Sequence, residues 1–161
     1  LTNETIKALT KIQKILSNNG LGLKLFDGYR PQKSVNNFVE WSKEISDTLT
    51  KEKYYPDEKK DSLFFKGYVA EKSGHSRGST VDVTLIYTDS INYGEELDMG
   101  SRWDFFGNKS WIDYDSITDI QKNNRNYLQM IMNQNGFKSY SKEWWHFTLI
   151  NEPYPDTYFD F

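Results

Sequence analysis

The sequence contains only two histidines, and each stands close to a carboxylate. His75 precedes Asp82 by seven residues in the stretch SGHSRGSTVD, and His146 follows Glu143 by three residues in EWWHF. The chain has no cysteine, so imidazole and carboxylate groups are the zinc-ligand types that remain. A chain that uses these residues together must fold so that two distant stretches meet. His75, Asp82 and His146 would then supply three zinc ligands and leave one position for water, with Glu143 beside it as a proton carrier.

Two β-strands are predicted to carry these residues. Residues 80–87, TVDVTLIY, and residues 144–150, WWHFTLI, are rich in β-branched and aromatic side chains. Asp82 lies near the start of the first strand, where a buried carboxylate needs a cation, a metal or hydrogen-bond donors. Residues three apart on a regular strand point to opposite faces. Glu143 and His146 can therefore share a site only if Glu143 precedes the strand or lies at a bulge.

Simpler interpretations of the same residues stay open at this point. A histidine among aromatic residues is commonly a packed, hydrogen-bonded core residue, and each of the two motifs occurs often by chance. Arg30 can be a surface arginine paired with Asp27. Asp104 can be a loop aspartate that turns the backbone, and Tyr68 can be a packing residue. The metal site is favoured because both histidines of the chain coincide with suitably placed carboxylates.

The remaining sequence predicts an α+β fold, in which a small, mostly antiparallel sheet is flanked by helices. Apolar residues at helical spacing and capping residues predict three helices. Alternating or β-branched runs predict strands, and charged or Gly-rich stretches predict loops. The expected helices cover residues 2–19, 31–49 and 116–135; the strands 21–25, 80–87, 137–140 and 144–150; and the loops 50–62 and 88–114. We expect one domain over residues 1–161, with no repeat or linker.

Composition excludes several classes of protein. The net charge is −3 and lysines are mixed with acids, whereas a nucleic-acid partner calls for a concentrated basic face. No apolar run approaches the ~18 residues of a membrane span. The absence of cysteine excludes disulfides. With no visible signal peptide we expect a cytoplasmic location, while a periplasmic or secreted one stays open because the chain begins at Leu1.

Four motifs in their order resemble one enzyme family. DGYRP, SGHSRGSTVD, MGSRWDF and EWWHF, with the closing NEPYPDTYFDF, are similar to motifs of the zinc D-alanyl-D-alanine dipeptidases of peptidase family M15, in particular the vancomycin-resistance type. The resemblance runs from about Leu9 to Phe161. Thr80 stands where the family usually has alanine, and Gly74 where the most similar members have serine. The segment that members carry before the first helix has no counterpart here.

The resemblance implies a fold, a cofactor and a reaction. The fold is that of the D,D-peptidases and the hedgehog signalling domain, with one Zn²⁺ per chain. The reaction is hydrolysis of the cell-wall precursor dipeptide D-Ala-D-Ala to two D-Ala. The resemblance also implies individual roles: Glu143 carries the proton, Arg30 stabilises charge on the substrate carbonyl, Asp104 holds the substrate ammonium, and Ser73 and Tyr68 position the dipeptide.

Two alternative functions remain at this stage. A D,D-carboxypeptidase would trim peptidoglycan stem peptides by the same reaction, but Asp104 argues against it because an acylated stem has no charge for that carboxylate. A non-catalytic binding module could hold zinc structurally on this fold. Glu143 argues against that function, since a structural site has no use for a proton carrier. The sequence leaves the oligomeric state open.

Overall fold

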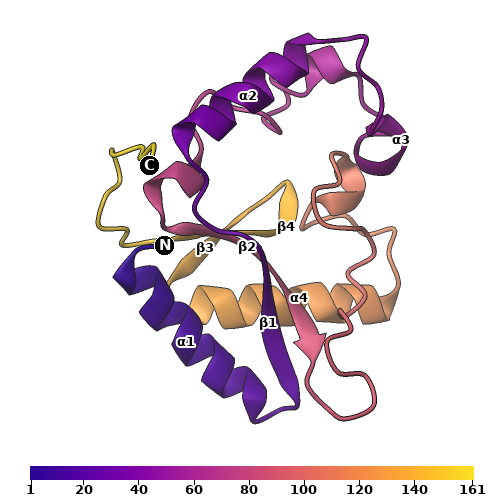
Figure 1. Cartoon of the computed structure of the whole chain (residues 1–161). Coiled ribbons are helices and arrows are strands. Elements are labelled where there is room, and N and C mark those ends of the chain that lie inside the picture. Colours follow the sequence, from indigo (N-terminus) through magenta and orange to yellow (C-terminus); the bar gives the residue numbers. More distant parts are fainter.

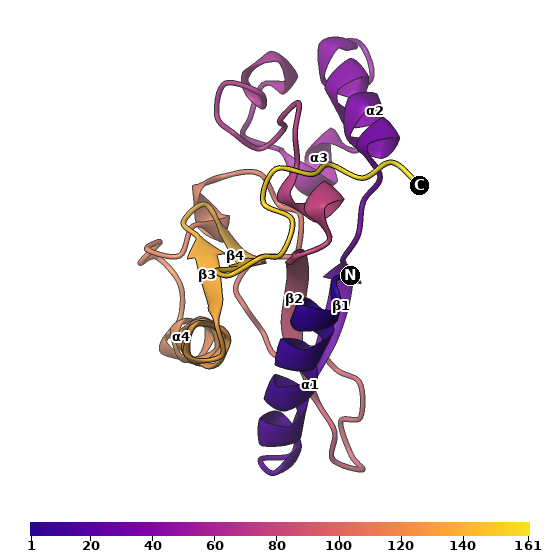
Figure 2. The ribbon, with the colours of Figure 1, turned by 90° about the vertical axis from the view of Figure 1, so that its left-hand side faces the viewer.

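The protein has the expected α+β architecture, built on a four-stranded antiparallel sheet. The computed structural model describes residues 1–161. The strands are β1 (Leu21–Asp27), β2 (Thr80–Tyr87), β3 (Phe137–Tyr140) and β4 (Glu143–Leu149), in the order β1-β2-β4-β3. Figures 1 and 2 show helices α1 and α4 packed along the sheet, and α2 with α3 beyond one end of strands β1 and β2. No helix of the structure combines the length and the hydropathy that crossing a bilayer requires.

Two amphipathic helices, both predicted from the sequence, cover one face of the sheet. Helix α1 (Asn3–Ser17) begins at Thr2, whose hydroxyl accepts the backbone N–H of Thr5. Helix α4 (Asp119–Gln134) begins with a reciprocal capping box between Thr118 and Gln121. Such caps satisfy N–H groups that have no partner inside a helix. Both predictions are therefore confirmed, with ends displaced by a few residues.

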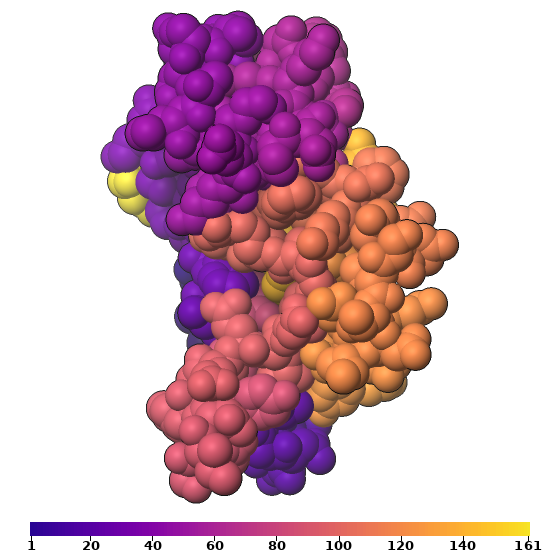
Figure 3. Space-filling model, turned by 90° about the vertical axis from the view of Figure 1, so that its right-hand side faces the viewer, coloured from indigo at the N-terminus to yellow at the C-terminus, as the bar shows by residue number.

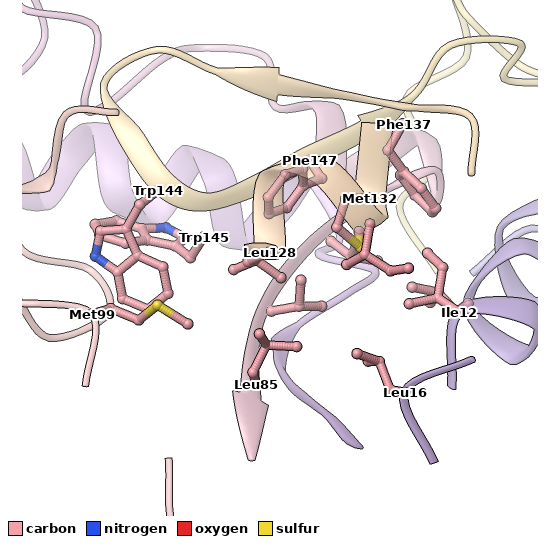
Figure 4. Packing of buried hydrophobic residues seen from close by; sticks show 14 of the residues in the cluster. Ile12, Leu16, Leu85, Met99, Leu128, Met132, Phe137, Trp144, Trp145 and Phe147 are labelled. Atoms are coloured by element: carbon pink, nitrogen blue, oxygen red, sulfur yellow. The ribbon is translucent and has the colours of Figure 1, made fainter. Parts of the chain in front are cut away.

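The main hydrophobic core lies between these helices and the sheet (Figure 4). Val81, Val83 and Leu85 of β2 point into it from alternate positions, as the strand pattern predicts. Full burial of an aliphatic or aromatic side chain contributes about 1.5–3 kcal/mol. The buried members are Leu9, Ile12, Leu16, Val81, Val83, Leu85, Leu97, Met99, Leu128, Ile131, Met132, Phe137, Trp144, Trp145, Phe147 and Leu149.

A second, smaller core lies under α2 (Gln32–Lys43) and α3 (Lys51–Tyr54), the purple cap of Figure 3. Here two predictions were wrong: α2 does not continue to Leu49, and residues 50–62 are not simply an exposed loop. The Lys60 ammonium is buried and donates hydrogen bonds to the carbonyl oxygens of Glu44 and Asp47, at 2.7 and 2.8 Å. Because those carbonyls face Lys60, the chain turns away from the helix after Lys43. The buried members are Tyr55, Leu63, Val69 and Phe106.

Short helical turns and an irregular stretch complete the chain. The 3₁₀ turns are η1 (Lys60–Ser62), η2 (Gly74–Arg77) and η3 (Asn108–Ser110). Residues 88–114 contain no longer helix and no ladder strand, as expected. They make one isolated bridge to β2, between Ile86 and Glu96.

The C-terminal residues bind two loops at the end of the sheet. The backbone of Phe159 donates to the Ser76 carbonyl at 2.9 Å and accepts the N–H of Gln32 at 3.0 Å. Arg77 is paired with Glu152 through two hydrogen bonds of 2.8 and 2.9 Å. In Figure 2 this segment runs in yellow from the sheet towards α2. It therefore ties η2 to the start of α2.

Candidate metal centre and active site

Three possible metal ligands from three different segments meet at one end of the sheet. His75 lies on η2, Asp82 on β2 and His146 on β4. Asp82 Oδ1 is 3.3 Å from His75 Nε2 and 3.0 Å from His146 Nδ1. One ligand atom from each residue lies within 4.8 Å of the other two. Tetrahedral zinc ligands at ~2.0–2.2 Å from the ion are separated by roughly 3.3–3.6 Å, so this spacing suits such an ion.

Register and capping explain why these side chains converge. Asp82 and His146 are directly opposed partners of the antiparallel β2–β4 ladder. The Ser73 hydroxyl accepts the backbone N–H of His75 at 3.2 Å and starts the η2 turn. Gly78 ends that turn in the left-handed region, with φ of 74°, where a side chain would be strained. The turn thereby folds the imidazole back over the first residues of β2.

The tautomer of His75 leaves a lone pair directed at Asp82. His75 Nδ1 lies 2.8 Å from the carbonyl oxygen of Gly28, so Nδ1–H donates there and neutral Nε2 is an acceptor. Nε2 and the Asp82 carboxylate are then two acceptors in contact, which repel each other unless a cation or a proton lies between them. The Trp103 indole N–H donates to the other carboxylate oxygen at 3.3 Å. Partners of this kind orient metal ligands, so these residues fit a metal.

Electrostatics keep the Asp82 carboxylate ionised. Burial by itself raises the pKa of Asp82, but the two neighbouring imidazoles outweigh it and the pKa falls below its ordinary value. Burial lowers the pKa of His75, and the adjacent Asp82 carboxylate reverses this, so the His75 pKa is raised. The site thus strongly favours positive charge beside Asp82, which a metal cation provides.

Glu143 stands beside the three candidate ligands. It is the first residue of β4 and pairs with Tyr140, and the ladder register shifts at this point. This confirms the predicted irregularity, which brings Glu143 Oε2 to 3.5 Å from His146 Nδ1. Burial raises the pKa of Glu143 to about 8. A nearby metal cation would favour its ionised form.

One cavity of about 200 Å³ brings together every predicted site residue. That volume is below the ~300–1,000 Å³ of sites for drug-sized ligands, which favours a small substrate. The eight residues are Arg30, Tyr68, Ser73, His75, Asp82, Asp104, Glu143 and His146. Apolar side chains, among them Val35, Phe38, Phe106 and Trp145, form much of the remaining wall.

Arg30 is paired with Asp27 and also lines the cavity, so it agrees with both interpretations given above. Its Nε donates to Asp27 Oδ2 at 2.9 Å, and its guanidinium lies 5.3 Å from the centre of the Phe38 ring. Its backbone N–H also donates to the His75 carbonyl at 3.4 Å. The Asp27 pair therefore holds the guanidinium on the cavity wall instead of withdrawing it to the surface. A planar, permanently charged group in that place suits an oxyanion.

Asp104 is held in an unusual backbone conformation with its carboxylate unpaired. Its φ is 61°, the only positive value at a non-glycine residue of the chain. No side-chain hydrogen bond or ion pair of the structure involves this carboxylate. Burial, with the neighbouring Asp82 charge, raises the Asp104 pKa to about 6. The cavity therefore contains an acidic group that a cationic ligand would stabilise.

The family is decided by a match over the full sequence. A family model described as D-ala-D-ala dipeptidase, of peptidase family M15, matches residues 1–161. The chain belongs to this family. Its sequence is 45% identical over 160 residues to a D-alanyl-D-alanine dipeptidase of Enterococcus faecium. It is 47% identical to that of Enterococcus faecalis and 44% identical to that of Streptomyces coelicolor. Each of these three matches covers 99% of the chain and 78% of the relative.

Some residues of this M15 site were not singled out from the sequence. Trp103 and the Gly28 carbonyl orient two candidate ligands, and both lie in motifs that carried the resemblance, so that signal was present. The Tyr140 ring lies 5.6 Å from the His146 ring, edge to face, and its hydroxyl donates to the Gly67 carbonyl at 3.3 Å. No local pattern marked Tyr140.

Tyr68, which was singled out, lines the cavity and also packs. Its ring stacks on Phe106 with centroids 5.1 Å apart, and its hydroxyl accepts the Trp111 indole N–H at 3.0 Å. Burial raises the Tyr68 pKa. The hydroxyl therefore stays protonated and can still donate towards a ligand.

Proposed function

We propose that this chain is a zinc dipeptidase that hydrolyses D-Ala-D-Ala to two molecules of D-Ala. The observation that carries the proposal is the convergence of three candidate ligands with buried Glu143 in one small cavity. His75, Asp82 and His146 would hold the ion. A zinc ion bound there supplies Lewis acidity, which polarises a carbonyl and lowers the pKa of a water to ~7.

Glu143 acts as the proton carrier. Its Oε2 lies 3.5 Å from His146 Nδ1, so a water beside the ligand atoms is within its reach. The carboxylate takes the proton of the attacking water and then gives it to the leaving amine. It is not needed as a ligand, because two imidazoles and Asp82 already fill that role. General acid–base catalysis of this kind contributes roughly 10²–10⁴-fold to the rate.

Arg30 stabilises the oxygen on which negative charge develops. The guanidinium is preorganised by Asp27 and by the Phe38 ring, so it need not reorganise during the reaction. A fixed charge aimed at a developing oxyanion is commonly the largest electrostatic contribution to catalysis.

Asp104 binds the free ammonium group of the dipeptide. Its carboxylate has no partner within the protein, and burial disfavours its charge, so a bound ammonium relieves an unfavourable state. Ser73 and Tyr68 line the same cavity and position the rest of the substrate. A cavity of about 200 Å³ with an acid for the amino end suits a free dipeptide better than an acylated stem.

The deciding experiment offers zinc-loaded protein D-Ala-D-Ala and N-acetyl-D-Ala-D-Ala and follows the release of D-Ala. We expect rapid release from the free dipeptide only, and release at least about 100-fold slower from the zinc-loaded Glu143→Gln control. Equal release from both substrates would replace the dipeptidase by a carboxypeptidase. Stoichiometric zinc without release from either substrate would instead indicate a binding module.

A further inference from the structure

Arg125 on α4 carries a buried positive charge that is not paired directly with a carboxylate. The residue is 2% exposed and forms no ion pair, although the charge of Asp98 partly offsets the effect of burial on its pKa. Burial lowers its pKa to about 10. A buried charge is unfavourable unless polar partners compensate it. Three carbonyl oxygens do so here: Nε donates to Met99 at 2.6 Å, Nη1 to Trp111 at 3.0 Å and Nη2 to Lys109 at 2.8 Å.

These three carbonyls lie at the two ends of one irregular segment, residues 99–111, here called the 99–111 loop. One planar guanidinium therefore closes the loop at its base. Inside the loop, the Ser110 hydroxyl donates to the Phe105 carbonyl at 2.7 Å and lies 3.0 Å from the Ser101 hydroxyl. The middle of the loop is tied to α3 by the backbone N–H of Phe106, which donates to the Tyr54 carbonyl at 2.7 Å. Outside the loop, Asn124 donates to the Asp98 carbonyl at 2.9 Å and holds the preceding residue to the exposed side of α4.

The 99–111 loop presents two groups to the candidate active site. Trp103 donates to Asp82, and Asp104 lines the cavity with its unpaired carboxylate. Asp104 has φ of 61°, a conformation that a non-glycine residue keeps only when the surrounding structure enforces it. Closing both ends of the loop limits the conformations that its middle can adopt. This links the Arg125 contacts to the direction of the Asp104 carboxylate.

We propose that Arg125 is a positioning residue for substrate binding, because it closes the 99–111 loop and thereby holds the Asp104 carboxylate in the cavity. The proposal rests on the function given above, in which Asp104 binds the substrate ammonium. Arg125 touches neither substrate nor metal. Its loss should therefore weaken dipeptide binding and leave the chemical step in place.

Arg125→Lys is the sharpest variant, because it keeps the charge but offers one compact ammonium in place of a fork that spans three carbonyls. We expect KM for D-Ala-D-Ala to rise roughly tenfold, the size of a typical coupling within one network. We expect kcat and zinc content to change little. Arg125→Gln, which removes the charge altogether, should shift KM in the same direction and serves if the lysine variant does not fold.

A double-mutant cycle with Asp104→Asn separates positioning from general stability. If Arg125 acts through Asp104, Arg125→Lys should change kcat/KM by less than about twofold in the Asp104→Asn background. Met132→Ala, which opens a space in the core on the same helix, is the control: it should lower Tm and leave KM unchanged. An equal loss of kcat/KM with and without Asp104, or no loss at all, would overturn the proposal.

Hydrogen exchange gives a readout that does not depend on the substrate. Amides of residues 99–111 should exchange faster in Arg125→Lys, and those of β2 and β4 should not, whereas Met132→Ala should leave the loop unaffected. Unchanged exchange in the loop would contradict the proposal whatever the substrate proves to be. A different outcome would count against the proposed function alone: the unmodified enzyme releases no D-Ala, while Arg125→Lys still speeds the exchange of the loop amides.

Discussion

The two sides of the cavity are built in different ways. On the sheet side, Asp82, Glu143 and His146 lie on paired strands. On the loop side, Arg30 and Asp104 lie on irregular segments. Arg30 is paired with Asp27, and Asp104 lies in the 99–111 loop, whose ends Arg125 binds. The ladder fixes the positions of the sheet-side groups, whereas side-chain contacts fix the loop-side groups.

This difference shows how metal binding and substrate recognition are separated in the proposed site. Metal ligands must be held to within a fraction of an ångström, and the paired strands provide that precision for Asp82 and His146. Groups that select a substrate are commonly placed on loops over a rigid scaffold, where they can change without loss of the scaffold. Changes on the sheet side should therefore abolish metal binding or catalysis. Changes on the loop side should leave the metal bound: loss of Arg30 should slow the reaction, and changes at Asp104 should mainly alter which substrate is accepted.

The largest effect is expected from the three candidate ligands. His146→Ala should remove most bound zinc and nearly all activity, because it deletes one of three ligands. His75→Ala and Asp82→Ala should do the same. Metal analysis of the purified variants, together with an assay of D-Ala release, checks this. Full zinc occupancy in the His146→Ala protein would show that the ion is held elsewhere.

The next largest effect is expected at Glu143, where a substitution should separate metal binding from catalysis on the sheet side. Glu143→Gln should keep zinc bound, because Glu143 is not a ligand, and should lower kcat by about 10²–10⁴-fold through loss of the proton carrier. Zinc content and steady-state kinetics are measured on the same preparation. Turnover close to that of the unmodified protein would remove Glu143 from the mechanism.

A smaller effect is expected on the loop side. Asp104→Ala should keep zinc and lower kcat/KM for D-Ala-D-Ala by one to two powers of ten, since a charge-assisted hydrogen bond contributes about 1.5–3 kcal/mol. The variant should discriminate less between D-Ala-D-Ala and its N-acetyl derivative, as measured by competition between the two. If its preference for the free dipeptide were undiminished, another group would bind the ammonium.

The smallest effect concerns packing behind the His75 turn. A Cβ on Gly74 would overlap with the hydroxyl of Thr80, which is hydrogen-bonded to Thr148 at 2.9 Å. Gly74→Ser should therefore lower the free energy of unfolding by about 1–3 kcal/mol, the usual effect of overpacking. Gly74→Ser combined with Thr80→Ala should recover most of it. Additive losses in denaturant unfolding would show that the two departures from the family pattern are independent.

Local pattern in the sequence was sufficient to predict the main body of the fold and to single out the candidate metal ligands. The apolar spacing of α1 and α4 and the alternation of Val81, Val83 and Leu85 predict elements that bury one face, and the structure has them. Both histidines were found because they are rare and stand beside carboxylates. The bulge at Glu143 followed from the geometry of a strand, since residues three apart cannot otherwise face one site.

Other features depend on contacts between segments far apart in the chain, and only the folded molecule decides them. Helix α2 ends at Lys43, and the buried Lys60 ammonium donates to the carbonyls of Glu44 and Asp47 beyond that end, an interaction that helical periodicity does not reveal. Asp104 adopts a left-handed conformation within a loop that Arg125 closes from another helix. The Gly28 carbonyl sets the tautomer of His75 from the end of β1. Periodicity records which face of an element is buried, but it carries no information about which distant polar group will meet a given carbonyl.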